Sequence, residues 1–465
     1  MAMKSITFSF ADQLPKGKDI ARVVPVESKD TEVTRTKTGS REIRIGVDAF
    51  KKMTRRKLQT LFRRVITIAK QNRIKQLAID MNDFAFANLA LPIRDVGQMA
   101  AINMQLANFE FIRYKTKPKE GWNLVEKITI KGAKSKDMRE GFRRGQIISG
   151  EINKMRELAN TPGGEMTPAV LAKAAMDAAD DTDINVQVLG VIEMELLGMG
   201  GILGVGKGSD SEPKFIVMEY MAGELGQKPI VLVGKGITFD TGGLNLKPGM
   251  SMEEMHMDMS GGAAVIHAIT AAAKLGVKRN IVALVPAAEN MPSGRSYRMG
   301  DVLRTMNGKT IEIGHTDAEG RVVLADALEY SKRYKPEVVI DVATLTGAAQ
   351  VALGQKASAF FATDEILEKK IRELGEKSGD YVWPFPLWEE YESMIKGTFA
   401  DVTNSSKTRG AGAIEGAMFL WQFIKGTPWV HIDMAPRMSS AEGDFLAKGS
   451  TGEPMRLLIA FLESQ

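Results

Sequence analysis

From residue 214 onward, short runs rich in Val and Ile alternate with stretches of helical periodicity. The runs KFIVMEY, PIVLVG, NIVALVPA and EVVIDVA are almost continuously apolar, and we expect helices at 260–275 and 322–334. Strands that are apolar on both faces are typical of a parallel sheet covered by helices on both sides. We therefore predict an α/β fold with a mostly parallel central sheet for this part of the chain.

Length and charge distribution both indicate more than one domain. The 465 residues exceed the size at which a single core usually stops growing. Residues 1–150 carry 31 Lys and Arg against 15 Asp and Glu, whereas the remainder carries 31 against 42. We expect a small basic α/β domain over 1–135, a connecting helix over 136–160 and a larger α/β domain over 161–465.

The basic N-terminal part combines expected strands in RIGVD, KQLAID and NFEFIRY with helices at 50–71 and 95–108. Its basic side chains cluster at Lys51-Lys52, at Arg55-Arg56-Lys57 and in the stretch 113–119, RYKTKPK. Such clusters are found on solvated surfaces, at contacts with acidic subunits and in nucleic-acid interfaces. Charge alone does not distinguish these uses, so DNA binding stays open as an alternative function.

The chain has no cysteine, which excludes disulfides, thiolate zinc sites and a cysteine nucleophile. It has only four histidines, which argues against a His-rich zinc site. Carboxylates must therefore hold any metal ion. No apolar run approaches the roughly 20 residues that span a bilayer. The N-terminus also lacks the apolar stretch and cleavage site of a signal peptide. We expect a cytoplasmic protein without a membrane segment.

Two segments, VLVGKGITFDTGGLNLKPGMSMEEMHMDMSGG and HTDAEGR, concentrate charged residues around glycines directly after predicted strands. They contain Lys235, Asp240, Lys247, Asp258, Asp317 and Glu319. Asp317 and Glu319 lie two residues apart, so in an extended segment their side chains point to the same side. Four neighbouring carboxylates repel one another unless cations neutralise them, and shared carboxylates are typical of two-metal sites.

The alternative is that these carboxylates form ordinary ion pairs with the two lysines at the surface. The interleaved glycines and the preceding strands favour the metal site. Its oxygen ligands suit Mg, Mn or Zn. A lysine beside two cations is pushed towards its neutral form, so Lys235 could be a ligand. Lys247 could stay charged and polarise a carbonyl group.

The segments GKGITFDTGG, KPGMSMEEMHMDMSGGAA, HTDAEGR, DVATLTGA and ELANTPGGEMTP resemble the signatures of the cytosolic leucyl aminopeptidase family. The resemblance covers roughly 150–465, and the basic region 1–135 matches the family's variable N-terminal domain only in size and position. It implies that 161–465 is the catalytic domain of a metalloprotease, an exopeptidase that hydrolyses an N-terminal Leu or other apolar residue from peptides. It also implies a cytoplasmic homohexamer, a dimer of trimers.

The resemblance also implies roles for individual residues. Two divalent ions (Mn, Zn or Mg) would be bound by Lys235, Asp240, Asp258, Asp317 and Glu319, with Asp240 and Glu319 bridging. Lys247 would stabilise the oxyanion, and Arg321 would hold a bicarbonate ion as the general base. The substrate would be contacted by Met255, Thr344, Leu345 and Gly347.

Four positions depart from the family pattern. His315 replaces a usual Asn, Thr241 replaces Ser, Glu415 stands where Thr is common, and Pro436 replaces a frequent Gly. All implied metal and catalytic positions are present. Two alternatives to an active aminopeptidase remain: a DNA-binding or architectural protein on a peptidase scaffold, and a weakly active paralogue whose Asp317 loop is altered by His315.

Overall fold

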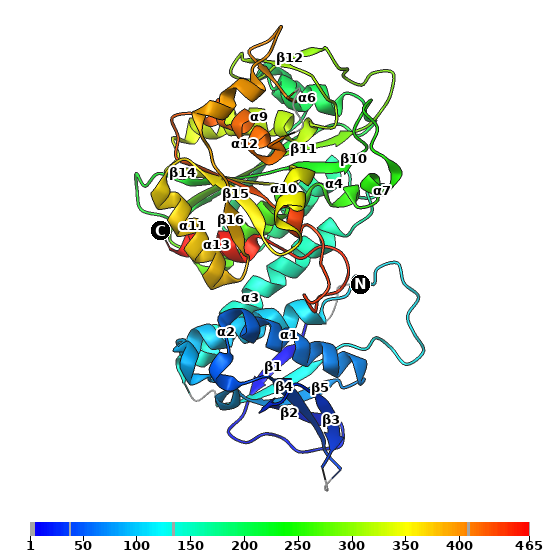
Figure 1. Ribbon diagram of the computed structural model, residues 1–465, viewed down its shortest axis with the longest axis vertical. Coiled ribbons are helices and arrows are strands. Elements are labelled where there is room, and N and C mark those ends of the chain that lie inside the picture. Colours follow the sequence, from blue (N-terminus) through cyan, green and yellow to red (C-terminus); the bar gives the residue numbers. More distant parts are fainter. Residues whose placement is uncertain (1–4, 37–38, 133–134, 407–409, 465) are drawn as a thin grey trace. The chain divides into compact units, whose positions relative to one another are not determined.

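The computed structural model describes residues 5–36, 39–132, 135–406 and 410–464 (Figure 1). The chain forms two compact units. The N-terminal unit comprises Met1–Asn153 with Ser440–Lys448, and the C-terminal unit comprises Lys154–Ser439 with Gly449–Gln465. The 24-residue helix α3 (Lys136–Ala159) begins in the first unit and ends in the second.

The N-terminal unit is built on a six-stranded sheet in the order β1-β6-β5-β2-β4-β3, parallel except for the pair β3–β4. The strands are β1 (Thr7–Phe10), β2 (Ile20–Glu27), β3 (Glu32–Arg35), β4 (Arg41–Val47), β5 (Gln76–Asp80) and β6 (Lys127–Lys131). The helices α1 (Arg55–Gln71) and α2 (Ile93–Asn108) complete it. Thr54 caps α1 by accepting a hydrogen bond from the backbone N–H of Lys57, so this helix begins later than predicted.

The predicted strand NFEFIRY is wrong, because α2 continues to Asn108 and no strand follows directly. The side-chain amide of Asn108 exchanges two hydrogen bonds of 2.9 Å with the backbone of Val125, and Phe109 is buried in a loop. Alternating apolar residues require a neighbouring strand to pair with. In this region β6 occupies the place between β1 and β5 instead.

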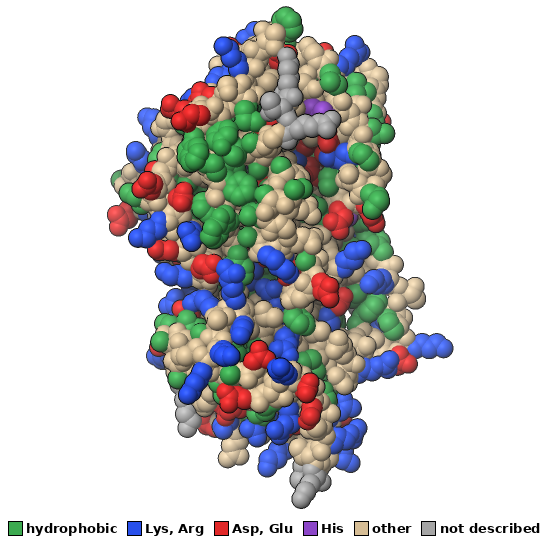
Figure 2. All heavy atoms as spheres, in the orientation of Figure 1, with side chains coloured by type: hydrophobic (Ala, Val, Ile, Leu, Met, Phe, Trp, Pro, Cys, Tyr) green, Lys and Arg blue, Asp and Glu red, His purple; other side chains and the backbone are tan. Residues whose placement is uncertain are grey.

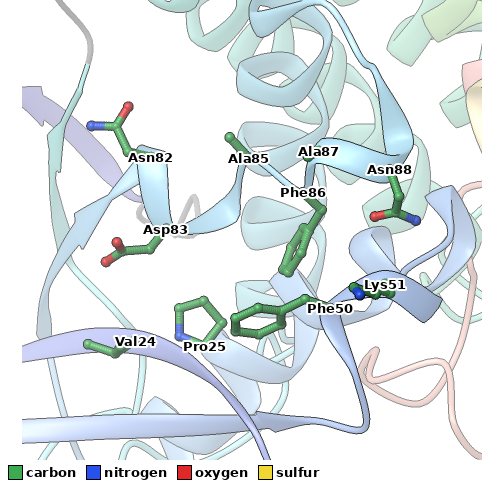
Figure 3. Close-up of a pocket in the computed structure, with 10 residues that line it drawn as sticks. All are labelled: Val24, Pro25, Phe50, Lys51, Asn82, Asp83, Ala85, Phe86, Ala87 and Asn88. Carbon is green, nitrogen blue, oxygen red and sulfur yellow. The ribbon is translucent and has the colours of Figure 1, made fainter.

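A cavity of about 420 Å³ lies in the N-terminal unit near the end of β5 (Figure 3). Phe50 and Phe86 form its aromatic part, with ring centroids 5.4 Å apart. Asp83 and Asn82 contribute polar groups to its lining. The cavity is therefore amphipathic.

The C-terminal unit is built on a nine-stranded sheet in the order β16-β15-β18-β14-β9-β11-β8-β7, with β10 paired to β11. Its strands are β7 (Ile184–Leu189), β8 (Lys214–Met221), β9 (Ile230–Gly234), β10 (Gly236–Asp240), β11 (Asn280–Asn290), β14 (Val338–Ala343), β15 (Ser358–Ala362), β16 (Val382–Pro384) and β18 (Trp429–Asp433). The five strands β10, β11, β9, β14 and β18 are mutually parallel. The prediction of an α/β fold with a mostly parallel sheet is confirmed.

Helices cover both faces of this sheet, as expected for strands that are buried throughout (Figure 1). One group that packs together consists of α6 (Gly200–Gly206), α9 (Glu319–Ser331) and α12 (Gly412–Ile424). The other consists of α4 (Pro168–Ala179), α8 (Ser260–Leu275), α11 (Glu365–Ser378) and α13 (Met455–Glu463).

Shorter elements complete the unit. They are the helices α5 (Val191–Leu196), α7 (Gly249–Met252) and α10 (Gly347–Leu353), and a small sheet of β12 (Val302–Arg304), β13 (Thr310–Glu312) and β17 (Val402–Thr403). Within the described ranges, no helix combines the length and apolarity required to cross a membrane.

Candidate metal centre

Polar residues stand at the carboxyl ends of all five parallel strands of the C-terminal unit. Lys235 follows β9, Asp240 and Asn290 end β10 and β11, Thr344 follows β14, and Asp433 ends β18. Because these strands run in the same direction, their carboxyl ends share one edge of the sheet. This edge places the charged groups of the site side by side.

Asp240 is fixed by the sharp turn that follows β10. Gly242 and Gly243 have φ angles of 86° and 64°, which favour glycine. The carboxylate Oδ1 of Asp240 accepts hydrogen bonds of 2.8 Å from the backbone N–H of Gly242 and from the amide of Asn290. Its other oxygen, Oδ2, is left to face the lysine and carboxylate groups described below.

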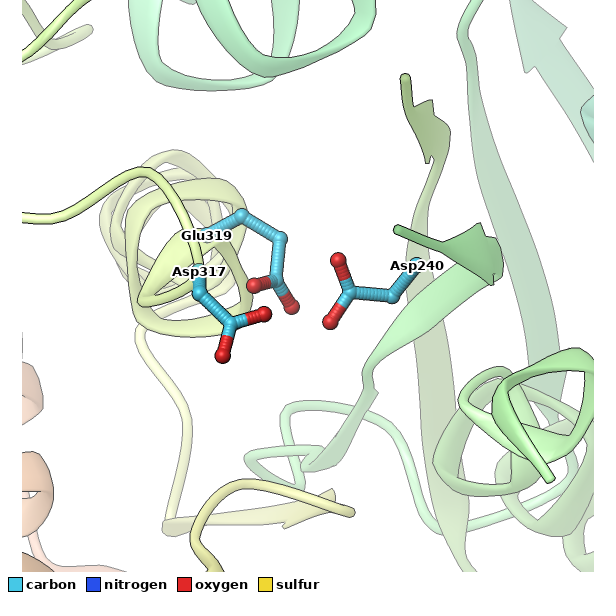
Figure 4. Close-up of side chains that lie close together, drawn as sticks. All are labelled: Asp240, Asp317 and Glu319. Carbon is cyan, nitrogen blue, oxygen red and sulfur yellow. The ribbon is translucent and has the colours of Figure 1, made fainter. Parts of the chain in front are cut away.

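Three carboxylates meet at this edge of the sheet (Figure 4). Asp240 comes from β10, Asp317 from the loop before α9, and Glu319 is the first residue of α9. One oxygen of each lies within 4.8 Å of the others. This spacing suits residues that share a metal ion.

Two lysines join the carboxylates into one network. Lys235 Nζ lies 2.8 Å from both Asp258 Oδ2 and Glu319 Oε1. Lys247 Nζ lies 2.9 Å from Asp240 Oδ2 and 2.6 Å from Asp317 Oδ1. The structure thus brings together the six charged residues that the sequence singled out, with Asp258 joined to Glu319 through Lys235.

Burial and neighbouring charges shift the protonation of these groups. Burial lowers the pKa of Lys235 and Lys247, but the surrounding carboxylates outweigh this effect and raise the pKa of both lysines. Burial also raises the pKa of Glu319 to about 8 and that of Asp258 to about 6, and the Asp240 carboxylate adds to both shifts. Glu319 and Asp258 therefore bind protons more tightly than exposed carboxyl groups do.

The unsatisfied oxygens fit a divalent cation. Oε2 of the buried Glu319 has no hydrogen-bond donor among the described residues. Glu319 Oε1, Asp258 Oδ2 and Asp317 Oδ1 are contacted by a lysine Nζ at 2.6–2.8 Å. Four carboxylates also face only two ammonium groups. Buried oxygens with spare lone pairs and excess negative charge are what hard cations require.

Gly320 makes room for Lys235. A Cβ atom at Gly320 would lie 2.6 Å from Lys235 Nζ and 2.5 Å from its Cε. The first turn of α9 can therefore approach the lysine only because no side chain stands between Glu319 and Arg321. Packing against Lys235 therefore requires a glycine at position 320 of the HTDAEGR segment.

The loop that carries Asp317 is held by Asn404. The Asn404 side chain accepts hydrogen bonds from the backbone N–H groups of Gly314 and His315 and donates to the carbonyls of His315 and Ala318. His315 Nδ1 accepts a hydrogen bond of 3.2 Å from the backbone N–H of Asp317. This bond, from a side chain to the backbone two residues on, is the kind that an Asn side chain makes.

The residues predicted to contact substrate lie around the same strand ends. Thr344 donates a 2.6 Å hydrogen bond to Asp258 Oδ1, and its carbonyl lies 3.2 Å from Lys235 Nζ. The backbone N–H of Leu345 donates to Asp433, so this residue is fixed by β18. Gly347 begins α10, and no atom of another residue stands where its side chain would be. Met255 is half-buried and begins the short 3-10 helix Met255–Met257 that precedes Asp258.

Arg321 lies apart from the network of lysines and carboxylates. Its Nη1 donates a 2.7 Å hydrogen bond to Glu415 Oε1 and a 2.9 Å hydrogen bond to the carbonyl of Asn404. Both members of this ion pair are 7% exposed. The sequence analysis identified Glu415 as a departure from the family pattern. It did not predict the contact of Glu415 with Arg321.

Sequence reasoning did not identify Asn290 and Asn404 as site residues. Asn290 follows Glu289 at the end of a strand whose middle is apolar, and that pattern could have identified it. Asn404 lies in a loop about 90 residues from its partners and shows no local pattern. Only the tertiary structure reveals it.

Comparison with known proteins gives a family match. The model of the cytosol aminopeptidase family, catalytic domain, matches residues 153–459. The probable cytosol aminopeptidase of Roseiflexus castenholzii is 43% identical over 408 residues, which are 86% of this chain and 83% of that protein. The corresponding protein of Methylobacillus flagellatus is 40% identical over 395 residues, which are 83% and 79% of the two chains.

Solved structures are similar over nearly the whole chain. The bottromycin maturation enzyme BotP superposes with a TM-score of 0.86 at 29% identity, covering 96% of this chain and 99% of that chain. BotP in complex with Mn gives a TM-score of 0.84 at 28% identity, covering 96% and 98%. The similarity therefore extends to the N-terminal part.

Proposed function

The chain belongs to the cytosol aminopeptidase family, and we propose that this aminopeptidase uses two divalent metal ions to release an N-terminal Leu or other apolar residue from peptides. The observation that carries the proposal is the cluster of Asp240, Asp317 and Glu319, whose carboxylate oxygens lie within 4.8 Å of one another. The Mn complex of a structural relative supports a divalent ion at this centre.

Each charged residue has a proposed role. The two ions would be held by Lys235, Asp240, Asp258, Asp317 and Glu319, and they supply Lewis acidity and a water of lowered pKa. In the metal-free centre the carboxylates raise the pKa of Lys247. As an ammonium group, Lys247 would donate a hydrogen bond to the oxyanion that develops on the scissile carbonyl. Thr344 orients Asp258 through its hydroxyl group.

Lys235 can act as a neutral ligand only if it loses a proton that the surrounding carboxylates now stabilise. Loading of the centre would therefore release protons from Lys235 and from Glu319. A free α-amine has a lone pair that can coordinate a metal ion, whereas the lone pair of an internal peptide nitrogen is delocalised into its carbonyl group, and this difference accounts for the proposed exopeptidase specificity. Attack by water needs no covalent intermediate, in keeping with a chain that has no cysteine.

We propose that Met255, Leu345 and Gly347 contact the first side chain of the substrate. The two apolar side chains favour Leu or a similar residue, and Gly347 leaves open space beside them. The similarity to an enzyme of bottromycin maturation makes a specialised peptide the alternative substrate.

Hydrolysis of Leu-p-nitroanilide by metal-stripped enzyme, with Mn, Zn, Mg or Co added back, tests this function. We expect activity only after metal addition. Glu319→Ala and Asp258→Ala should lose it by roughly a thousandfold or more while keeping the circular dichroism spectrum of the wild type. Near-normal turnover in either variant would refute the ligand assignment. Inactivity with every metal, on this compound and on a panel of dipeptides, would refute the function.

Assembly as a homohexamer in the cytoplasm is part of the proposal. The C-terminal unit exposes large apolar side chains, among them Val351, Trp388 and Phe399, and Figure 2 shows hydrophobic side chains gathered on this unit. Exposed apolar patches mark contacts with other proteins.

DNA binding by the N-terminal unit is the alternative from another class of function. Many Lys and Arg side chains lie on this unit in Figure 2. A DNA mobility shift that weakens steeply with salt would support it.

A further inference from the structure

Arg321 and Glu415 form a buried ion pair close to the candidate metal centre. Arg321 lies in the first turn of α9, two residues after Glu319, and Glu415 lies in the first turn of α12. The Glu415 carboxylate lies 2.7 Å from Arg321 Nη1, and both side chains are buried. The positive end of the α12 dipole also favours a negative charge at this position.

The pair is connected to the loop that carries Asp317. The same Nη1 atom of Arg321 donates to the carbonyl of Asn404, and the Asn404 side chain makes four hydrogen bonds to residues 314–318. A chain of direct contacts therefore runs from Glu415 through Arg321 and Asn404 to the segment of Asp317.

The Glu415 carboxylate opposes a bicarbonate ion on Arg321. Nη1 of Arg321 already donates to Glu415 and to Asn404, so a bicarbonate would have to take its hydrogen bonds from Nη2 and Nε. It would also place a second negative charge beside the Glu415 carboxylate in a buried environment, where like charges repel strongly. Bicarbonate and a glutamate carboxylate are both anions that accept charge-assisted hydrogen bonds from a guanidinium, as Glu415 Oε1 does from Arg321 Nη1, so one can stand in for the other.

We propose that Glu415 replaces bicarbonate as the resident anion on Arg321, so that this aminopeptidase needs no exogenous anion. Glu415 is then a positioning residue: it holds Arg321, and through Asn404 the loop of Asp317, in the arrangement needed for turnover. The catalytic part of this inference rests on the proposed function, whereas the occupancy of Arg321 by a protein carboxylate does not.

The test compares the wild type with Glu415→Thr and Glu415→Gln, each loaded with Mn, in bicarbonate-free buffer and with sodium bicarbonate added. The Thr variant removes the carboxylate and opens space beside Arg321. The Gln variant removes the charge but keeps the space filled, so it is the matched control.

We expect the wild-type rate to be unchanged by bicarbonate. Glu415→Thr should lose kcat by roughly tenfold or more without bicarbonate, the effect of losing a hydrogen bond to a charged group, and regain it saturably as bicarbonate is added. Glu415→Gln should lose activity and gain nothing from bicarbonate. Full activity of Glu415→Thr without bicarbonate, or strong stimulation of the wild type, would overturn the proposal.

Thermal unfolding supplies a readout that does not depend on turnover. Bicarbonate should raise the melting temperature of Glu415→Thr, because an ion that binds only the folded state stabilises it, and should not raise that of the wild type. If no variant hydrolyses any substrate, the proposed function fails, yet this shift still decides the anion proposal. If Glu415→Thr does not fold, a bicarbonate-dependent shift or rate in the wild type would still contradict the proposal.

Discussion

His315 makes a hydrogen bond that an Asn side chain at the same position could also make. Its Nδ1 accepts the backbone N–H of Asp317, and its backbone is held on both sides by Asn404. The residue change therefore preserves the local hydrogen bond that shapes the loop. This geometry argues against the hypothesis of a weakly active paralogue.

We predict that His315→Asn changes kcat/KM for Leu-p-nitroanilide by less than about threefold, because both side chains can accept the same backbone hydrogen bond. His315→Ala is the matched control, since it removes the acceptor, and it should lose activity by about tenfold. A large gain of rate in His315→Asn would mean that the native loop is poorly arranged and would contradict this reading.

At the residue scale, the charged residues of the site could be predicted from the sequence. The residues that hold them in place by hydrogen bonds could not. Lys235, Asp240, Asp258, Asp317 and Glu319 stand in short glycine-rich segments after strands, so local sequence carries their signal. Asn404 and the partner of Arg321 are reached only by long-range contacts, across 83 and 94 residues from Arg321. No local pattern encodes such contacts.

At the element scale, the parallel strands explain why the site forms where it does. Five parallel strand ends deliver polar groups to one edge, and the Val- and Ile-rich runs that form these strands were visible in the sequence. The strand predicted for NFEFIRY does not form because it has no neighbouring strand. A strand exists only where a neighbour completes its hydrogen bonds, and Asn108 instead ties the chain to Val125.

The helices α6 and α9 are joined by a buried carboxylate with a testable pH dependence. Asp326 of α9 accepts hydrogen bonds from the backbone N–H groups of Gly201 and Ile202 in α6 and from that of Met306. Burial raises the pKa of Asp326 from 3.8 to about 7, although these donors oppose the shift. Between these pKa values the folded protein binds the proton more tightly than the unfolded chain, so stability from this group falls as pH rises.

We therefore predict that Asp326→Asn gains stability relative to the wild type as pH rises from about 5 to about 8, because the amide does not ionise. Melting temperatures of both metal-free proteins, measured by calorimetry across this range, provide the check. Taking the difference between the two proteins cancels the other titrating groups. A difference that stays constant, or that moves against the variant with rising pH, would show that Asp326 is already ionised at low pH.

At the scale of the whole molecule, the site and the basic charge belong to different units. Every residue of the candidate metal centre lies in the C-terminal unit, whereas residues 1–150, with their excess of Lys and Arg, lie in the N-terminal unit. Length and charge distribution predicted two domains. The sequence did not indicate that Ser440–Lys448, near the end of the chain, belongs to the N-terminal unit.

The central claim is that the carboxylate and lysine cluster of the C-terminal unit holds two metal ions, and a Mn²⁺ titration of the metal-free protein followed by electron paramagnetic resonance tests it most directly. We predict that the signal of free Mn²⁺ appears only after two ions per chain are bound, and that the bound ions are magnetically coupled, as expected for ions about 3.5–4 Å apart. Glu319→Gln should weaken binding and abolish the coupling. Uncoupled binding, or a titration that Glu319→Gln leaves unchanged, would contradict the account.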